Sequence, residues 1–192
     1  MCPLCSAVFA QNALPALPPP LLSPAEKRAA FTAVTPAHLA PFGVSTPSDP
    51  SRRVVTGIIT ADTKAAGGPS QARLALVVQY DYDLRGSLRS LVDVAAGNIV
   101  SVTTIANDTP PLAPGEYARA GALALADPRV RDALAAVAAS AHAEAGVSLI
   151  SDPQDQMYGD RVARVLFRTD AGYVRTAFAV YVDLTNNTVQ LR

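Results

Sequence analysis

A ten-residue sequence pattern is repeated in this chain, first as Leu91-Val92-Asp93-Val94-Ala95-Ala96-Gly97-Asn98-Ile99-Val100 and later as Tyr181-Val182-Asp183-Leu184-Thr185-Asn186-Asn187-Thr188-Val189-Gln190. Each copy is a β-branched run that ends in Val-Asp, followed by a short polar turn and a second apolar run. The turns contain Gly and Asn, the residues that most readily adopt positive φ. Each copy therefore predicts a β-hairpin.

The two hairpins also predict which side chains are buried. Val92 and Val182 hold equivalent positions, and each is expected to face the core of its own sheet. Asp93 and Asp183 come directly before the turns, where a carboxylate can accept hydrogen bonds from the turn's backbone N–H groups. These two residues are expected to be structural.

A helix is predicted ahead of each hairpin. Ser23-Pro24-Ala25-Glu26 has Ser at the N-cap, Pro at N1 and Glu at N3, which is the pattern of a capping box, and this helix should end before Pro36. Pro114 and Glu116 begin the second helix in the same way, although Ala113 is a poor cap. The repeat therefore predicts an α+β fold of two tandem units, each a helix packed on an antiparallel sheet of about four strands.

The remaining elements follow from periodicity. Asp127-Pro128 restarts the second helix, and Gly146 is its predicted end, after an apolar stripe of Val130, Leu134, Val137 and Ala141. Lys64–Ser70 predicts a turn or loop. The predicted strands are Arg53–Thr60, Ala72–Tyr82, Leu88–Val94 and Ile99–Ile105 in the first unit, and Val162–Thr169, Val174–Leu184 and Val189–Arg192 in the second.

The N-terminal residues 1–22 are expected to be a partial signal peptide followed by a Pro-rich segment. The expected domains are then 23–106 and 107–192. The first ten residues are uncharged and end in Val8-Phe9-Ala10 before Gln11, which fits a signal-peptidase site. A basic n-region is missing, so the true start is expected upstream. This pattern favours a secreted protein whose mature chain begins near Gln11.

Charge and hydropathy narrow the classes of partner. Lys+Arg and Asp+Glu both number 16, so the chain is neutral and has no electrostatic reason to bind nucleic acid. No apolar run in the sequence approaches the roughly 20 residues that span a bilayer. We therefore expect neither a nucleic-acid partner nor a membrane span.

The sequence offers few candidates for metal or redox chemistry. Cys2-Pro3-Leu4-Cys5 is a C-x-x-C without a second pair or a nearby His to complete a zinc site, and it fits leftover signal-peptide residues. His38 and His142 lie far apart and lack the spacing of paired metal ligands. Asp152, Asp155 and Asp160 share a polar loop but match no calcium-loop spacing.

One acidic cluster lies at the end of a predicted strand. The alternation of Asp81-Tyr82-Asp83 puts both carboxylates on one face, where a cation could bind, although two solvated charges at a turn are the favoured interpretation. This cluster is also the one place to test a rival hypothesis, in which the sheet's concave face is an enzyme pocket. Since no known catalytic motif occurs, we expect no catalytic, cofactor-binding or metal-ligating residue.

The order of these segments resembles the two small N-terminal domains of the copper-dependent primary amine oxidases. The similarity runs in sequence order from about residue 20 to the last residue. The matching segments are Pro20–Glu26, Leu91–Ser101, Thr109–Leu112 with Glu116-Tyr117, Ala126–Val130, Arg161–Phe167 and Ala179–Leu184. The resemblance implies two cystatin-like domains.

The family's chemistry lies in a large β-sandwich that holds copper and a topaquinone made from a tyrosine, and that deaminates primary amines with release of peroxide. This chain has two His, no His-x-His and no Asn-Tyr followed by an acidic residue, and it stops where the sandwich would begin. The resemblance therefore implies a non-catalytic packing module, truncated or stand-alone, without copper or topaquinone of its own. Its expected partners are an amine oxidase catalytic domain or a homodimer contact. The alternative is a stand-alone cystatin-like binding or inhibitory module.

Overall fold

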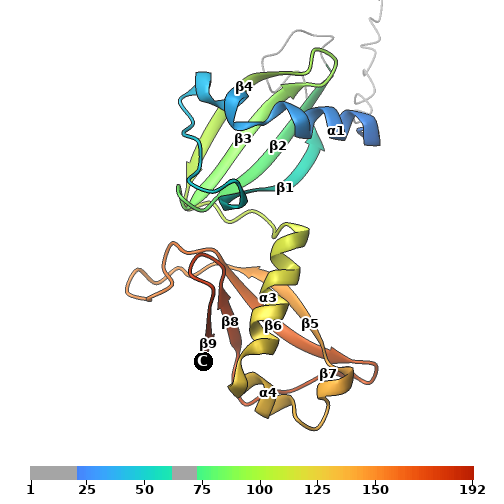
Figure 1. Ribbon diagram of the computed structural model, residues 1–192, viewed down its shortest axis with the longest axis vertical. Coiled ribbons are helices and arrows are strands. Elements are labelled where there is room, and N and C mark those ends of the chain that lie inside the picture. The colour runs from blue at the N-terminus through green and yellow to red at the C-terminus, as the bar shows by residue number, and fades with distance from the viewer. Residues whose placement is uncertain (1–20, 62–72) are drawn as a thin grey trace, which may run out of the picture.

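The computed structural model describes residues 21–61 and 73–192, which form an α+β structure with two antiparallel sheets (Figure 1). The Cys2–Cys5 motif, the signal-peptide residues up to position 20 and the predicted Lys64–Ser70 turn lie outside the described residues. Within the described residues, no helix is long and apolar enough to cross a bilayer.

The first sheet has four strands in sequence order: β1 (Arg53–Thr60), β2 (Leu74–Asp81), β3 (Gly86–Asp93) and β4 (Asn98–Ala106). Helix α1 (Pro24–Ala33) crosses one face of this sheet (Figure 1). The predicted capping box is confirmed, since Ser23 Oγ accepts from Glu26 N and Glu26 Oε2 accepts from Ser23 N. The short helices α2 (Pro36–Leu39), η1 (Ala40–Phe42) and η2 (Pro50–Arg52) link α1 to β1.

The face of the sheet under α1 forms its main core. Ala30 and Ala33 of the helix pack on Ala75, Val77 and Val92, and these five side chains are almost fully buried. Small side chains at the contact let the helix lie close to the strands. Ala75 and Val77 have the same parity along β2, so they lie on the face of the sheet that α1 covers.

The second sheet follows α3 (Pro114–Ala126), α4 (Pro128–Leu134) and η3 (Ala138–Ser140) in the chain. Its strands run in the order β5 (His142–Ser148), β6 (Val162–Thr169), β8 (Val180–Asp183) and β9 (Thr188–Leu191), and the short β7 (Gly172–Tyr173) pairs with β6. Helix α3 packs across the sheet and contacts β5, β6, β8 and β9 (Figure 1).

Two predictions in this part of the chain are wrong. The helix ends at Leu134 rather than at Gly146, which lies inside β5. The Ala-rich sequence looks helical, but Ala143 and Ala145 point inward against the second core as a strand, and a Cβ added to Gly121 of α3 would lie 3.1 Å from Ala143 Cβ. The predicted strand Val174–Leu184 is also interrupted, because regular pairing there resumes only at Val180.

The predicted hairpins are confirmed as β3–β4 and β8–β9. Val92 and Val182 are both fully buried, as the repeat predicts. The two sheets are nevertheless not as separate as their sequences suggest. Tyr80 and Tyr82, at the end of β2, belong to the core of the second sheet together with residues of α3, β6 and β8.

Candidate functional site

A buried polar network lies where the two sheets meet. Its centre is Arg161, which directly precedes β6 and is fully buried. Arg161 pairs with Glu116 in the first turn of α3 through two parallel hydrogen bonds, Nε to Oε1 at 3.0 Å and Nη2 to Oε2 at 3.0 Å. The same guanidinium donates to the carbonyl oxygens of Pro110 and Pro111, at 2.6 and 2.9 Å. Arg161 therefore fixes the linker between the sheets.

Glu116 connects this ion pair to the first sheet. Its carboxylate accepts a hydrogen bond from the Tyr82 hydroxyl at 2.6 Å and another from Ala113 N at 2.6 Å. Arg119 donates to the Tyr82 hydroxyl and to the Leu184 carbonyl, both at 2.8 Å. Although burial opposes ionisation, the hydrogen bonds from Arg161 and Tyr82 hold the pKa of Glu116 below its ordinary value. Every oxygen of this buried carboxylate therefore has a partner.

Aromatic contacts strengthen the same junction. The Arg161 guanidinium lies over the Tyr80 ring at 4.4 Å from its centroid, a cation–π geometry. Tyr80 and Tyr82 meet edge to face, with centroids 5.1 Å apart. Burial raises the pKa of Tyr80 to about 12, so its hydroxyl stays protonated at neutral pH. The junction is thus an interlocked set of fixed charges and rings.

The predicted acidic cluster has a different role from the one expected. Asp81 is almost fully buried and pairs with Arg53, whose Nε lies 2.7 Å from Asp81 Oδ2, so the interpretation as two solvated charges is wrong for this residue. Its other oxygen caps the turn by accepting from the backbone N of Asp83 and of Leu84. Asp83 is more exposed and pairs separately with Arg52 at 2.5 Å. The two carboxylates therefore serve two ion pairs rather than one shared cation.

The other predicted candidates are not brought together. His38 contacts the Ala33 carbonyl through Nδ1 at 2.9 Å, whereas His142 begins β5 in the other half of the chain. Asp152 and Asp155 cap turns in the loop before β6. Within the described residues, no group of three or more His, Cys, Asp or Glu side chains could hold a metal ion.

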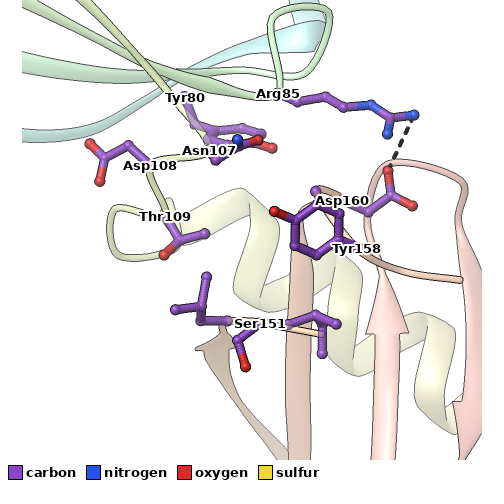
Figure 2. A pocket seen from close by; sticks show the side chains of 11 residues that line it. Tyr80, Arg85, Asn107, Asp108, Thr109, Ser151, Tyr158 and Asp160 are labelled. Atoms are coloured by element: carbon purple, nitrogen blue, oxygen red, sulfur yellow. Dashed lines mark ion pairs between the residues drawn. The ribbon is translucent and has the colours of Figure 1, made fainter. Parts of the chain in front are cut away.

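A cavity of about 240 Å³ opens beside the junction, between the two sheets (Figure 2). Residues from the end of the first sheet and from the linker form one wall, and the segments on either side of the loop before β6 form the other. Figure 2 shows the side chains of Arg85 and Asp160 reaching toward each other across this gap. The lining residues are Tyr80, Arg85, Asn107, Asp108, Thr109, Leu149, Ile150, Ser151, Tyr158, Gly159 and Asp160.

Asp160 is the least satisfied group of the cavity wall. Its side chain is almost fully buried, and its Oδ1 lies 3.5 Å from Arg85 Nη2 without a hydrogen bond, while Oδ2 accepts from Asn186 at 3.2 Å. Burial, followed by the nearby charge of Asp183, raises the pKa of Asp160 above its ordinary value. This is a polar contact across the junction, but no nucleophile and base face each other there.

Sequence reasoning found only part of this junction. Glu116 was expected as a helix cap, and the structure gives it the second role of anchoring Arg161. Arg161 stands in an otherwise ordinary strand start, and nothing in its local sequence marks it as buried. Tyr82 carries a weak signal, because an aromatic residue between two Asp residues at a strand end is unusual for a solvated turn.

Comparison with known proteins supports the fold. No family model matches the sequence, and no curated protein matches it. Among solved structures, the chain is similar to a copper-containing benzylamine oxidase from Hansenula polymorpha, with a TM-score of 0.54 and 13% identity. The similarity covers 89% of this chain but 29% of that enzyme's chain, so the chain spans less than a third of that enzyme's length. At this identity the comparison shows a shared fold.

Proposed function

We propose that this chain is the non-catalytic N-terminal region of a copper amine oxidase-like protein. Its role would be structural: two cystatin-like domains, 23–106 and 107–192, that pack against a further domain or subunit. The proposal is carried by the fold similarity, because that similarity runs through almost the whole of this chain and through a minor part of the amine oxidase. The order of elements, a helix and sheet followed by a second helix and sheet, supports it.

The state of the acidic side chains agrees with a structural role. A general acid or base must be free to exchange a proton with a substrate. Asp81 and Glu116 are instead buried in ion pairs with Arg53 and Arg161, and their remaining lone pairs accept backbone or hydroxyl hydrogen bonds. These contacts hold elements together and leave neither carboxylate open to a ligand.

The outer face of the second sheet is suited to packing. Leu166 is 44% exposed and lies between the buried residues Val165 and Phe167, so it points away from α3. Tyr173 of β7 is 63% exposed. Large apolar side chains on a face without a covering helix are typical of surfaces that bind another domain.

The proposal is tested with the purified 192-residue chain incubated with Cu²⁺ and then with benzylamine or methylamine. We expect no amine-dependent peroxide and no quinone absorbance, while a complete copper amine oxidase assayed in parallel produces both. Peroxide formation that depends on the amine would contradict the non-catalytic role. Sequencing of the transcript beyond the Arg192 codon tests the other half of the proposal, since an amine oxidase-like chain should continue into a region with His-x-His and a quinone-forming tyrosine.

A further inference from the structure

We propose that the cavity between the two sheets binds a free α-amino acid with a small apolar side chain. The carboxylate of the ligand would accept hydrogen bonds from Arg85, and its ammonium group would donate to Asp160. Its apolar side chain would lie among the tyrosine rings and aliphatic residues of the cavity wall. This inference concerns the junction of the two sheets and does not rest on the proposed amine oxidase relationship.

Asp160 supplies one half of the site. Its side chain is 5% exposed and lines the cavity, yet Oδ1 accepts no hydrogen bond, while Oδ2 accepts from Asn186 Nδ2. A buried carboxylate oxygen without a donor is unfavourable, because burial removes the water that would otherwise bind it. Burial, followed by the nearby charge of Asp183, raises the pKa of Asp160, and a cationic donor at Oδ1 opposes both effects. Oδ1 is therefore an acceptor suited to an ammonium group.

Arg85 supplies the other half of the site. Its side chain is 53% exposed and reaches toward Asp160 from the opposite wall of the cavity (Figure 2). The contact between them, 3.5 Å from Arg85 Nη2 to Asp160 Oδ1, is not a hydrogen bond, and the guanidinium donates to no other residue of the described chain. The backbone of Arg85 is held in the left-handed region at φ 49°, where its carbonyl oxygen accepts from Asn107 N. The N–H donors of Arg85 are thus open to a ligand.

The two groups together select a ligand that carries both charges. A ligand with only a carboxylate would pair with Arg85 but lie beside the carboxylate of Asp160. A ligand with only an ammonium group would pair with Asp160 but lie beside the guanidinium. An α-amino acid carries both groups on one carbon, so it places them as neighbours, as the two protein groups are. Its insertion replaces one ion pair that has no hydrogen bond by two charge-assisted contacts.

The remaining charge of the cavity wall does not compete for this ligand. Arg85, Asp108 and Asp160 are the charged residues of the lining. Asp108 accepts hydrogen bonds from the Ser87 hydroxyl and from Arg89 Nη2, so its charge is already paired. The open charges of the lining are therefore one cation and one anion, which matches a zwitterion.

The rest of the wall suits an apolar side chain. Tyr80, Tyr158, Leu149 and Ile150 all line the cavity, and Tyr158 and Leu149 are well exposed to solvent. Covering them removes apolar surface from water, which favours binding. The cavity holds about 240 Å³, below the roughly 300–1,000 Å³ of pockets for drug-sized ligands. Its size therefore suits one small amino acid rather than a peptide or a large cofactor.

The test uses L-leucine as the probe. Isothermal titration calorimetry of the 192-residue chain compares L-leucine with isopentylamine, which lacks its carboxylate, and with isocaproate, which lacks its ammonium group. We expect saturable binding of L-leucine with a Kd of about 1 mM or tighter. Each analogue should bind roughly tenfold or more weakly, because it leaves one charged group of the cavity unpaired. Saturating L-leucine should also raise the Tm.

Three variants locate the ligand. Asp160→Asn and Arg85→Gln should each bind L-leucine roughly tenfold or more weakly than the wild type, because each removes one charge-assisted contact. Arg168→Gln is the matched control, since Arg168 has a similar exposure but pairs with Glu144 outside the cavity, and it should bind as the wild type does. Circular dichroism checks that all three variants are folded.

Three results would overturn the proposal. The first is the absence of saturable L-leucine binding to the wild type. The second is binding to Asp160→Asn and Arg85→Gln as tight as to the wild type, which would place the ligand elsewhere. The third is binding of isopentylamine or isocaproate as tight as that of L-leucine, since the cavity would then not select a zwitterion. None of these results bears on the proposed structural role, which peroxide formation and the transcript test separately.

Discussion

Asp93 and Asp183 make the same turn in two different sheets. Asp93 Oδ1 accepts from the backbone N of Ala95 at 2.9 Å and of Ala96 at 3.0 Å. Asp183 Oδ1 accepts from the backbone N of Thr185 at 2.8 Å and of Asn186 at 3.1 Å. The repeat in the sequence is therefore a repeat in hydrogen bonding. The surroundings differ, since Asp183 is 3% exposed and its second oxygen accepts from Asn186 Nδ2 at 2.7 Å.

This difference predicts unequal costs for the same substitution. Asp93→Asn should lower the free energy of unfolding by about 1 kcal/mol or less, because the amide oxygen can still accept the two turn bonds. Asp183→Ala should cost more than Asp93→Ala, because Asp183 is almost fully buried and accepts the Asn186 side-chain amide in addition to the two turn N–H groups. Urea denaturation of Asp93→Asn, Asp93→Ala and Asp183→Ala measures these values. Equal losses at the two positions would contradict the role given to burial.

The equivalent valines predict a large effect. Val182→Asp buries a charge without a partner and should cost several kcal/mol. The control is Val147→Asp, an exposed position on β5, where the cost should stay near 0.5 kcal/mol or below. Val92→Asp should be as damaging in the first sheet.

Hydrogen exchange can show how far each defect spreads. Because Tyr80 and Tyr82 belong to the second core, loss of packing at Val182 should also expose amides at the end of β2. Protection around Ala30 and Val77, which form the first sheet's own core, should largely persist. Complete loss of protection in both sheets would show instead that the chain unfolds as one cooperative unit.

The Arg161–Glu116 pair predicts strong coupling. Removing one partner, as in Arg161→Met or Glu116→Gln, leaves the other group buried without its ion-pair partner and should cost roughly 3–5 kcal/mol. The double variant Arg161→Met/Glu116→Gln should cost clearly less than the sum of the two single changes. Arg164→Met, on the exposed side of β6, is the matched control and should be nearly neutral. Additive losses in the cycle would show that the pair is not coupled.

Two carboxyl groups at the junction predict opposite responses to pH. The pKa of Glu116 is lowered in the folded state, so its contribution to stability is present above its ordinary pKa and is lost as pH falls through the folded pKa. The pKa of Asp160 is raised, so its ionised form weakens the folded state, and this penalty disappears as pH falls through the raised pKa.

These signs predict that Asp160→Asn raises the midpoint of thermal unfolding at pH 7, since the amide removes the repulsion from Asp183 and can still accept from Asn186. The gain should shrink in acid, where the wild-type carboxyl is protonated. Glu116→Gln should make the midpoint of thermal unfolding fall less steeply as the pH is lowered, because the variant has no carboxylate at this position to protonate. Thermal unfolding of the three proteins from neutral to acidic pH measures both effects, and a destabilising Asp160→Asn at pH 7 would contradict the account of Asp160.

The structural elements that depend on short-range contacts could be predicted from the sequence. The capping box at Ser23 and Glu26, the strand Arg53–Thr60 and the two Val-Asp hairpins depend on neighbours a few residues away, so short-range chemistry specifies them. The strand β5 was missed for the opposite reason. An Ala-rich segment fits a helix by itself, and it becomes a strand through antiparallel pairing with β6 and close packing of Ala143 against Gly121 of α3.

The junction was decided by the tertiary structure alone. Arg161 is separated from Glu116 by 45 positions and from Pro110 by 51, and no local pattern pairs a charge with a partner at such a distance. Asp81 looked solvated because it stands at a turn, yet folding brings Arg53 against it and removes both from water. The sequence by itself determined the capped first helix, the strands of the first sheet and the duplicated hairpins. Burial and long-range pairing of charges determined how the two sheets are joined, because those energies exist only once distant segments meet.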